Sequence, residues 1–147
     1  MKKCVSAVLC IALALSICTH ATAATPDELW LAAESLREQG IMVGDQTGSL
    51  HLDDSLTRAE LAAILCRLRV NQEHIAAEEA LYTRYCTFPD VPDWARVYVG
   101  YCAFNGLMVG YDTGAFGTSD SVTPAAACTV VLRHLGISGW DYETACQ

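Results

Sequence analysis

The chain has 147 residues, with nine Lys and Arg against 17 Asp and Glu and a formal net charge of −8. An acidic chain repels the phosphate backbone of nucleic acids, whose binding requires basic residues that displace counterions. We therefore exclude nucleic acid as a partner. The length suffices for one compact domain with a hydrophobic core.

The first 23 residues predict a secretory signal peptide. Lys2 and Lys3 form its positive region, residues 5–18 are apolar, and residues 21–23 have the small-x-small pattern of a cleavage site. The apolar run is shorter than the roughly 20 residues of a membrane span, and a retained N-terminal anchor is the alternative. We expect an exported chain without a transmembrane segment, in which 17 acidic residues stand against seven arginines.

Five cysteines follow the predicted signal peptide: Cys66, Cys86, Cys102, Cys128 and Cys146. Export permits disulfides, and an odd number leaves at least one thiol free or paired outside the chain. The sequence has no Cys-x-x-Cys pair and no Cys/His cluster, so it predicts no zinc site. We expect no metal and no other cofactor.

An internal repeat decides the predicted architecture. A shift of 66 positions aligns Gly40–Leu68 with Gly106–His134 without a gap, and 11 of the 29 pairs are identical. Each copy predicts a helix, a loop and a second helix. We expect an all-α fold with repeats at 24–70 and 88–137, joined by a linker at 71–87 that is helical in its first half. Residues 138–147 are expected to lead toward a third repeat that is absent.

The first helix of copy one begins with a capping box of Thr25 and Glu28 and ends at Gly40. Its apolar stripe consists of Leu29, Ala32, Ala33 and Leu36. In copy two, Pro92-Asp93 starts the equivalent helix, which stops at Gly106.

A loop with two glycines four positions apart follows each first helix, where glycine permits positive φ and a tight turn. The four glycines are Gly44, Gly48, Gly110 and Gly114. Aspartates in the first loop suggest calcium, but an EF-hand loop requires a glutamate at its twelfth position. Counting from Asp45 places Leu56 there, so we reject a calcium site.

The second helices begin differently in the two copies. Thr57-Arg58-Ala59-Glu60 is a complete capping box, in which the threonine and glutamate satisfy each other's backbone N–H groups. Thr123-Pro124 also starts a helix, but Ala126 replaces the glutamate.

In this order the motifs resemble those of the S-layer homology family. The matching segments are Phe88-Pro89-Asp90-Val91 with Pro92 and Trp94-Ala95, Gly40–Gly44 and Gly106–Gly110, Gly114-Ala115-Phe116, and Thr57–Glu60. The resemblance covers most of the chain after the predicted signal peptide, roughly residues 26–69 and 88–136. It implies a pseudo-threefold helical assembly that attaches non-covalently to the bacterial cell wall and holds pyruvylated secondary cell-wall polysaccharide in grooves between repeats.

The resemblance also implies the binding residues. Arg58 would contact the anionic sugar, because a guanidinium can hold a carboxylate with two parallel hydrogen bonds, and Thr57 and Glu60 would fix the helix start beneath it. The other candidates are Trp94, Tyr111, Gly44, Gly48, Gly110 and Gly114. The alternatives are that Arg58 is a solvated residue, that Trp94 packs in the core or between repeats, and that Tyr111 is an ordinary exposed loop residue.

Copy two departs from the family pattern, since Pro124 and Ala126 replace the arginine and glutamate. We therefore expect one intact groove at most. The predicted function is a secreted, non-enzymatic module of the cell wall or S-layer that binds a peptidoglycan-linked secondary cell-wall polymer. The alternative is a degenerate repeat for self-assembly or for association with partner repeats. A Cys–His nucleophile at His134 is rejected, since no orienting partner motif accompanies it.

The repeat also bears on disulfide pairing. Cys102 and Cys128 align with Leu36 and Ala62, positions expected to face each other across the helix pair. Cys102–Cys128 is therefore the favoured disulfide if one forms, and two adjacent buried thiols are the alternative.

Overall fold

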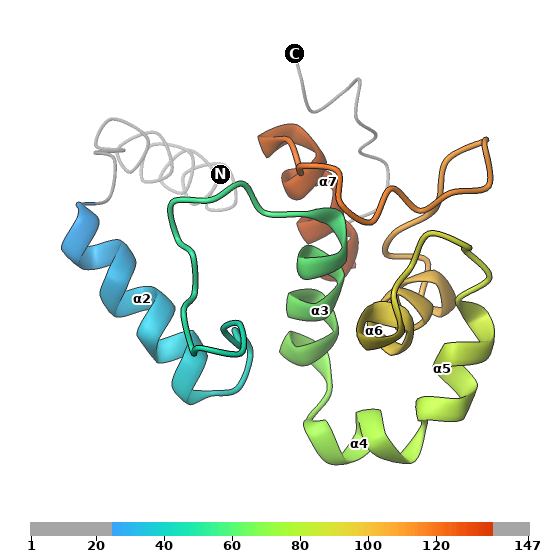
Figure 1. Cartoon of the computed structure of the whole chain (residues 1–147), viewed down its shortest axis with the longest axis horizontal. Helices are drawn as coiled ribbons and strands as arrows, with labels where there is room; N and C mark the ends of the chain where they lie inside the picture. The colour runs from blue at the N-terminus through green and yellow to red at the C-terminus, as the bar shows by residue number, and fades with distance from the viewer. Residues whose placement is uncertain (1–24, 137–147) are drawn as a thin grey trace, which may run out of the picture. The chain divides into compact units, whose positions relative to one another are not determined.

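The computed structural model describes residues 25–136; the predicted signal peptide, the tail and Cys146 lie outside this part. Its helices are α2 (Pro26–Glu38), α3 (Arg58–Arg69), α4 (Gln72–Ala77), α5 (Glu79–Tyr85), α6 (Asp93–Phe104) and α7 (Pro124–His134) (Figure 1). Between residues 25 and 136 there is no strand, only an isolated bridge between Thr57 and Ser121. The all-α class is confirmed, whereas the pseudo-threefold arrangement and the repeat boundaries stay predictions. No described helix is long and apolar enough to cross a membrane.

The chain divides into two compact units whose boundary lies between Glu34 and Ser35, within α2. In the first unit, α2 begins as predicted: the Thr25 hydroxyl accepts a hydrogen bond from the Glu28 N–H at 3.3 Å, and the Glu28 carboxylate accepts one from the Thr25 N–H at 2.8 Å. The second unit contains α3 to α7, so it combines segments of both repeats.

The core of the second unit forms where α6 packs against α3 on one side and against α5 on the other. Its largest fully buried side chains include Leu65 and Cys66 of α3, Val99 and Cys102 of α6, and Phe116. The second helix of copy one therefore packs against the first helix of copy two. Phe116 follows the second glycine loop and packs into the core.

The linker between the repeats is helical in its first half, as predicted, and its second half is helical as well. It forms α4 and α5, which bury Ile75 and Tyr82 respectively. The reason is tertiary: α5 lies so close to α6 that a Cβ atom on Gly100 would stand 1.8 Å from the Tyr82 carbonyl oxygen. Glycine at position 100 permits this approach, and the linker thereby becomes part of the core.

The predicted helix ends at Gly40 and Gly106 are confirmed. Both glycines have positive φ, 70° and 66°. The N–H of the following residue returns to the helix in each copy, Ile41 to the Leu36 carbonyl and Leu107 to the Cys102 carbonyl, both at 2.9 Å. This is the left-handed helix termination that glycine favours.

Candidate functional site

The capping box at the start of α3 is present as predicted. The Thr57 hydroxyl accepts a hydrogen bond from the Glu60 N–H at 3.3 Å, and the Glu60 carboxylate accepts one from the Thr57 N–H at 2.8 Å. At the start of α7 the Thr123 hydroxyl alone accepts from the Ala126 N–H, at 3.2 Å. The more fully capped helix is the one that begins with Arg58.

Arg58 extends from α3 to the second glycine loop. Its Nε donates to the Phe116 carbonyl at 2.9 Å, and Nη2 donates to the Val109 carbonyl at 2.7 Å. Its Cζ lies 4.8 Å from the ring centroids of both Tyr111 and Phe116, within cation–π range. The alternative of a solvated arginine does not fit these contacts, because Arg58 is half-buried and its guanidinium is hydrogen-bonded to the other repeat. It is thereby fixed in one orientation.

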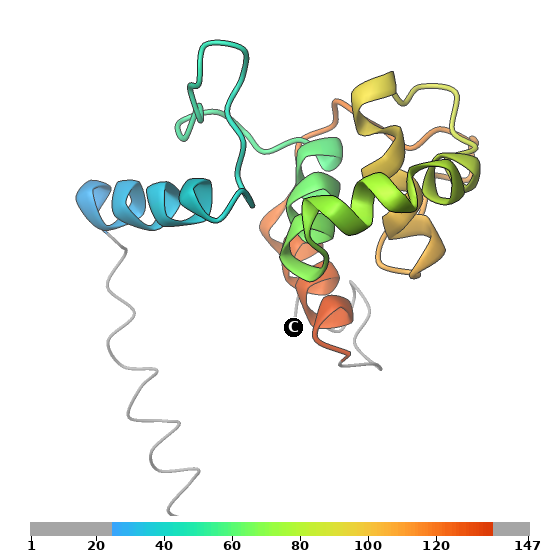
Figure 2. The ribbon, with the colours of Figure 1, turned by 90° about the horizontal axis from the view of Figure 1, so that it is seen from below.

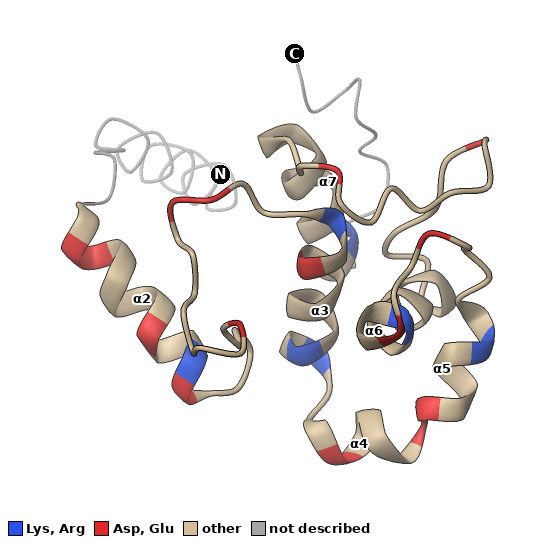
Figure 3. Cartoon of the chain, viewed as in Figure 1, with Lys and Arg blue, Asp and Glu red and all other residues tan. Residues whose placement is uncertain are grey.

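Arg58 also lines a pocket between the start of α3, the segment after α6 and one face of α7. The pocket has a volume of about 180 Å³ and is lined by Arg58, Met108, Val109, Ala126, Thr129, Val130 and Arg133. Arg69 at the other end of α3 donates to the His134 carbonyl, and Figures 1 and 2 both show α7 alongside α3. Two arginines from different repeats thus meet on one largely apolar pocket. The ribbon in Figure 3 is blue, the colour of Lys and Arg, near both ends of α3.

Arg133 was not a predicted site residue. The repeat has an arginine at both equivalent positions, 67 and 133, and this agreement could have pointed to Arg133. The two arginines have different roles. Arg67 donates to the Tyr98 hydroxyl at 2.9 Å and stacks on that ring with its Cζ 4.6 Å from the centroid. The residue that corresponds to Tyr98 in copy one is Ala32, which carries no such acceptor.

Asp90, from the Phe-Pro-Asp-Val motif, organises the loop that holds Arg58. Its carboxylate accepts hydrogen bonds from the N–H groups of Phe116 at 2.7 Å, Gly117 at 2.8 Å and Thr118 at 3.0 Å. Desolvation raises the pKa of Asp90, but these bonds outweigh it and lower the pKa to about 2. Since the Phe116 carbonyl accepts from Arg58, Asp90 indirectly fixes the position of that acceptor.

Tyr111 is part of the same arrangement. Its hydroxyl donates to the Asp120 carboxylate at 3.0 Å, which raises the pKa of Tyr111, and its ring lies against the Arg58 guanidinium. Trp94, by contrast, is 54% exposed in the first turn of α6 and does not line the pocket. Its predicted contact with the polysaccharide stays a prediction, and the alternative of core packing does not fit this exposure.

The four loop glycines have two different roles. Gly48 and Gly114 have positive φ, 83° and 84°, as the sequence predicted. Gly44 and Gly110 do not; they are required because a Cβ atom would stand 2.6 Å from the Ser49 carbonyl oxygen in one loop and 2.3 Å from the Phe88 ring in the other. None of the four lines the Arg58 pocket.

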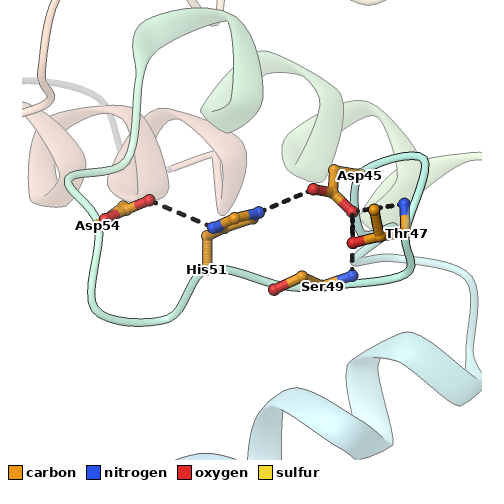
Figure 4. A network of polar contacts seen from close by, with 5 residues as sticks. All are labelled: Asp45, Thr47, Ser49, His51 and Asp54. Atoms are coloured by element: carbon orange, nitrogen blue, oxygen red, sulfur yellow. Dashed lines mark hydrogen bonds and ion pairs between the residues drawn. The ribbon is translucent and has the colours of Figure 1, made fainter.

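The first loop is held by a polar network instead of a tyrosine (Figure 4). Asp45 accepts hydrogen bonds from the Thr47 N–H and hydroxyl, both at 2.7 Å, and from the Ser49 N–H at 3.1 Å. His51 lies between two carboxylates, with Nε2 2.9 Å from Asp45 and Nδ1 3.4 Å from Asp54. Its hydrogen bond to Asp45 raises the pKa of His51 and lowers that of Asp45. In the described part of the chain, no group of three or more His, Cys, Asp or Glu residues is arranged to hold a metal ion.

The favoured Cys102–Cys128 disulfide is not present. Both are free thiols, as are Cys66 and Cys86. Cys102 is buried where α6 meets α3, with Sγ 3.6 Å from the Ala62 carbonyl oxygen, whereas Cys128 is exposed on α7. The expected facing of the two cysteines fails because Cys102 lies against Ala62 of copy one instead of against α7 of its own copy. Burial raises the pKa of the Cys66 thiol to about 12, so it is unreactive at neutral pH.

Comparison with known proteins bears on the family. The chain is 29% identical over 146 residues to the middle cell wall protein of Brevibacillus brevis, a match that covers 92% of this chain and 14% of that protein. It is 30% identical over 144 residues to the surface layer protein of Brevibacillus choshinensis (92% and 13%) and 32% identical over 94 residues to cell surface glycoprotein 1 of Acetivibrio thermocellus (63% and 4%). The resemblance to the S-layer homology family is confirmed.

The chain spans only a small part of these relatives, at most 14% of their length. No model of a known protein family matches it, and no solved structure does. The predicted location at the cell wall or S-layer agrees with these relatives, whose names refer to the cell wall, the surface layer and the cell surface.

Proposed function

We propose that the chain is a non-enzymatic, secreted module of the bacterial cell wall that binds pyruvylated secondary cell-wall polysaccharide in the Arg58 pocket. The observation that carries this proposal is the convergence of Arg58 and Arg133 on one pocket of an otherwise acidic chain. The similarity to cell-wall and surface-layer proteins supports the location.

The pocket suits one anionic substituent of a polysaccharide. Its volume of about 180 Å³ is below the roughly 300–1,000 Å³ typical of pockets that enclose whole small molecules. A carboxylate on a pyruvyl ketal would lie between the two guanidinium groups, and Met108 and Val130 would contact the ketal methyl group. Arg58 needs no reorientation to bind, because the carbonyls of Phe116 and Val109 already fix its guanidinium.

Arg58 also joins the two repeats, so its removal would perturb the fold as well as the pocket. Arg133 provides the cleaner test, because it is exposed on α7. Arg133→Ala removes one charge-assisted contact, worth about 1.5–3 kcal/mol, and should weaken retention on purified, protein-free sacculi about tenfold or more. Arg84→Ala, an exposed arginine of α5 outside the pocket, is the control of equal charge.

Sacculi from which mild acid has removed the ketal-bound pyruvate provide the second arm. The unmodified chain should bind them much more weakly than intact sacculi. Equal retention of Arg133→Ala and Arg84→Ala, or equal binding to both kinds of sacculi, would refute the proposed pocket.

A further inference from the structure

The packing of α6 against α3 provides a template for a second interface. At its centre the Cys102 thiol of α6 donates to the Ala62 carbonyl of α3 at 3.6 Å. On α3, the residues that become buried include Ala59, Ala62, Leu65 and Cys66, none more than 1% exposed. The first helix of copy two thus covers an apolar face of the second helix of copy one.

The 66-residue repeat places a copy of that apolar face on α7. The residues that correspond to Ala59, Ala62, Leu65 and Cys66 are Ala125, Cys128, Val131 and Leu132, which we call the α7 acceptor face. It is open: Cys128 is exposed, Val131 is 44% exposed, and Ala125 and Leu132 are half-buried. All four residues are uncharged, as their counterparts are.

The same repeat places the matching surface on α2. On α6, Ala95, Tyr98, Val99 and Cys102 are buried. Their counterparts on α2 are Leu29, Ala32, Ala33 and Leu36, which we call the α2 docking face. This face carries no charge either, so both halves of the α3–α6 interface have an uncharged equivalent elsewhere in the chain.

We propose that the α2 docking face of one copy of this chain binds the α7 acceptor face of a second copy, in the register in which α6 binds α3. The register is specific: because Cys102 lies against Ala62, Leu36 of one copy lies against Cys128 of the other. The two surfaces differ, so the contact is head-to-tail, and it can continue from copy to copy until a ring closes. This interaction does not depend on polysaccharide binding.

A disulfide trap tests the register on the full chain. Leu36→Cys should form a disulfide with the native Cys128 of another copy, giving reductant-sensitive dimers and larger species on a denaturing gel. The control Glu38→Cys places the thiol about 200° around the helix and should give little of this product. Leu36→Cys combined with Cys128→Ser should give none. A disulfide that joins the introduced thiol to Cys128 only within one chain, or no such disulfide, would overturn the proposal.

Complementing variants test the head-to-tail geometry under reducing conditions. Cys128→Asp and Leu29→Asp each place a charge on one face at an exposed position, so each variant should stay folded and should be monomeric by light scattering. A one-to-one mixture should form a dimer, since each variant keeps the face that the other has lost. Cys128→Ser should associate like the unaltered chain.

The proposal is overturned if the unaltered chain is monomeric at all concentrations, which would assign the α7 acceptor face to a helix of another protein. It is also overturned if the mixture remains monomeric. Retention of the Cys128→Asp variant on sacculi would separate self-association from polysaccharide binding, since binding in the Arg58 pocket is tested at Arg133 and does not require association.

Discussion

Replacing Gly100 by alanine should destabilise the fold, contrary to what helix propensity alone predicts. Gly100 lies inside α6, where alanine is ordinarily favoured over glycine by about 1 kcal/mol. Here, however, the added Cβ would stand 1.8 Å from the Tyr82 carbonyl oxygen and 2.6 Å from its carbonyl carbon. These are backbone atoms of α5, so the two helices must move apart. Such overpacking costs about 1–3 kcal/mol; since the clash is with backbone atoms that cannot rotate away, we expect the upper part of this range and a net loss of about 2 kcal/mol.

Thermal unfolding of the full chain measures this effect. A loss of 1 kcal/mol lowers Tm by about 4–8 °C in a domain of 60–100 residues, and fluorescence of Tyr82 and its neighbours should report the opening of the α5–α6 contact. Ala80→Gly, at an exposed position of α5, measures helix propensity without any clash and should cost about 1 kcal/mol. An unchanged or higher Tm for Gly100→Ala would refute the reasoning, because α5 would then not depend on the absence of a side chain at position 100.

Two further predictions concern the loops. Asp90→Asn removes a carboxylate that accepts three backbone hydrogen bonds, so it should lower both Tm and polysaccharide retention. The pKa of Asp90 in the folded chain, about 2, lies below its usual 3.8, so the stabilisation is present above pH 3.8 and is lost as the pH falls toward 2. A plot of Tm against pH should therefore lose its acidic slope in the variant. In the first loop the pKa of His51 is raised by Asp45 first and also by Asp54 and Glu60, so its stabilisation is complete below pH 6.5 and is lost as pH rises through the higher folded pKa. NMR titration of the imidazole checks this, and a His51 pKa at or below 6.5 would contradict the network. So would a His51→Gln variant whose loop resonances change with pH in the same way as those of the unaltered chain.

Local patterns made a large part of the fold predictable. Capping boxes at Thr25 and Thr57 and glycine terminations at Gly40 and Gly106 depend on residues within one helix turn, so they can be read directly from the sequence. The 66-residue repeat added the helix-loop-helix order.

Features that depend on contacts across the fold could not be predicted in this way. The second half of the linker, α5, packs against α6 because Gly100 admits the Tyr82 backbone, a contact between residues 18 positions apart with no local signal. Asp90 was a motif residue without an assigned task until the structure placed its carboxylate beneath the Phe116–Thr118 backbone. The disulfide prediction failed because repeat equivalence identifies positions that face each other within a helix pair, but not which copy supplies each helix of the pair.

Equivalent positions in the two repeats have the same backbone and different chemistry. Asp45, His51 and Asp54 align with Tyr111, Gly117 and Asp120. In copy one the imidazole bridges two carboxylates, whereas in copy two the tyrosine hydroxyl reaches Asp120 directly, across a glycine whose Cβ would stand 2.4 Å from the tyrosine ring. The loop of copy one therefore requires His51 between its two carboxylates, whereas the loop of copy two requires glycine at the equivalent position, because a side chain at 117 would collide with the Tyr111 ring. The ring of Tyr111 then provides the surface on which Arg58 stacks. The repeat that has Pro124 in place of its own arginine therefore supplies the loop that positions the arginine of the other repeat.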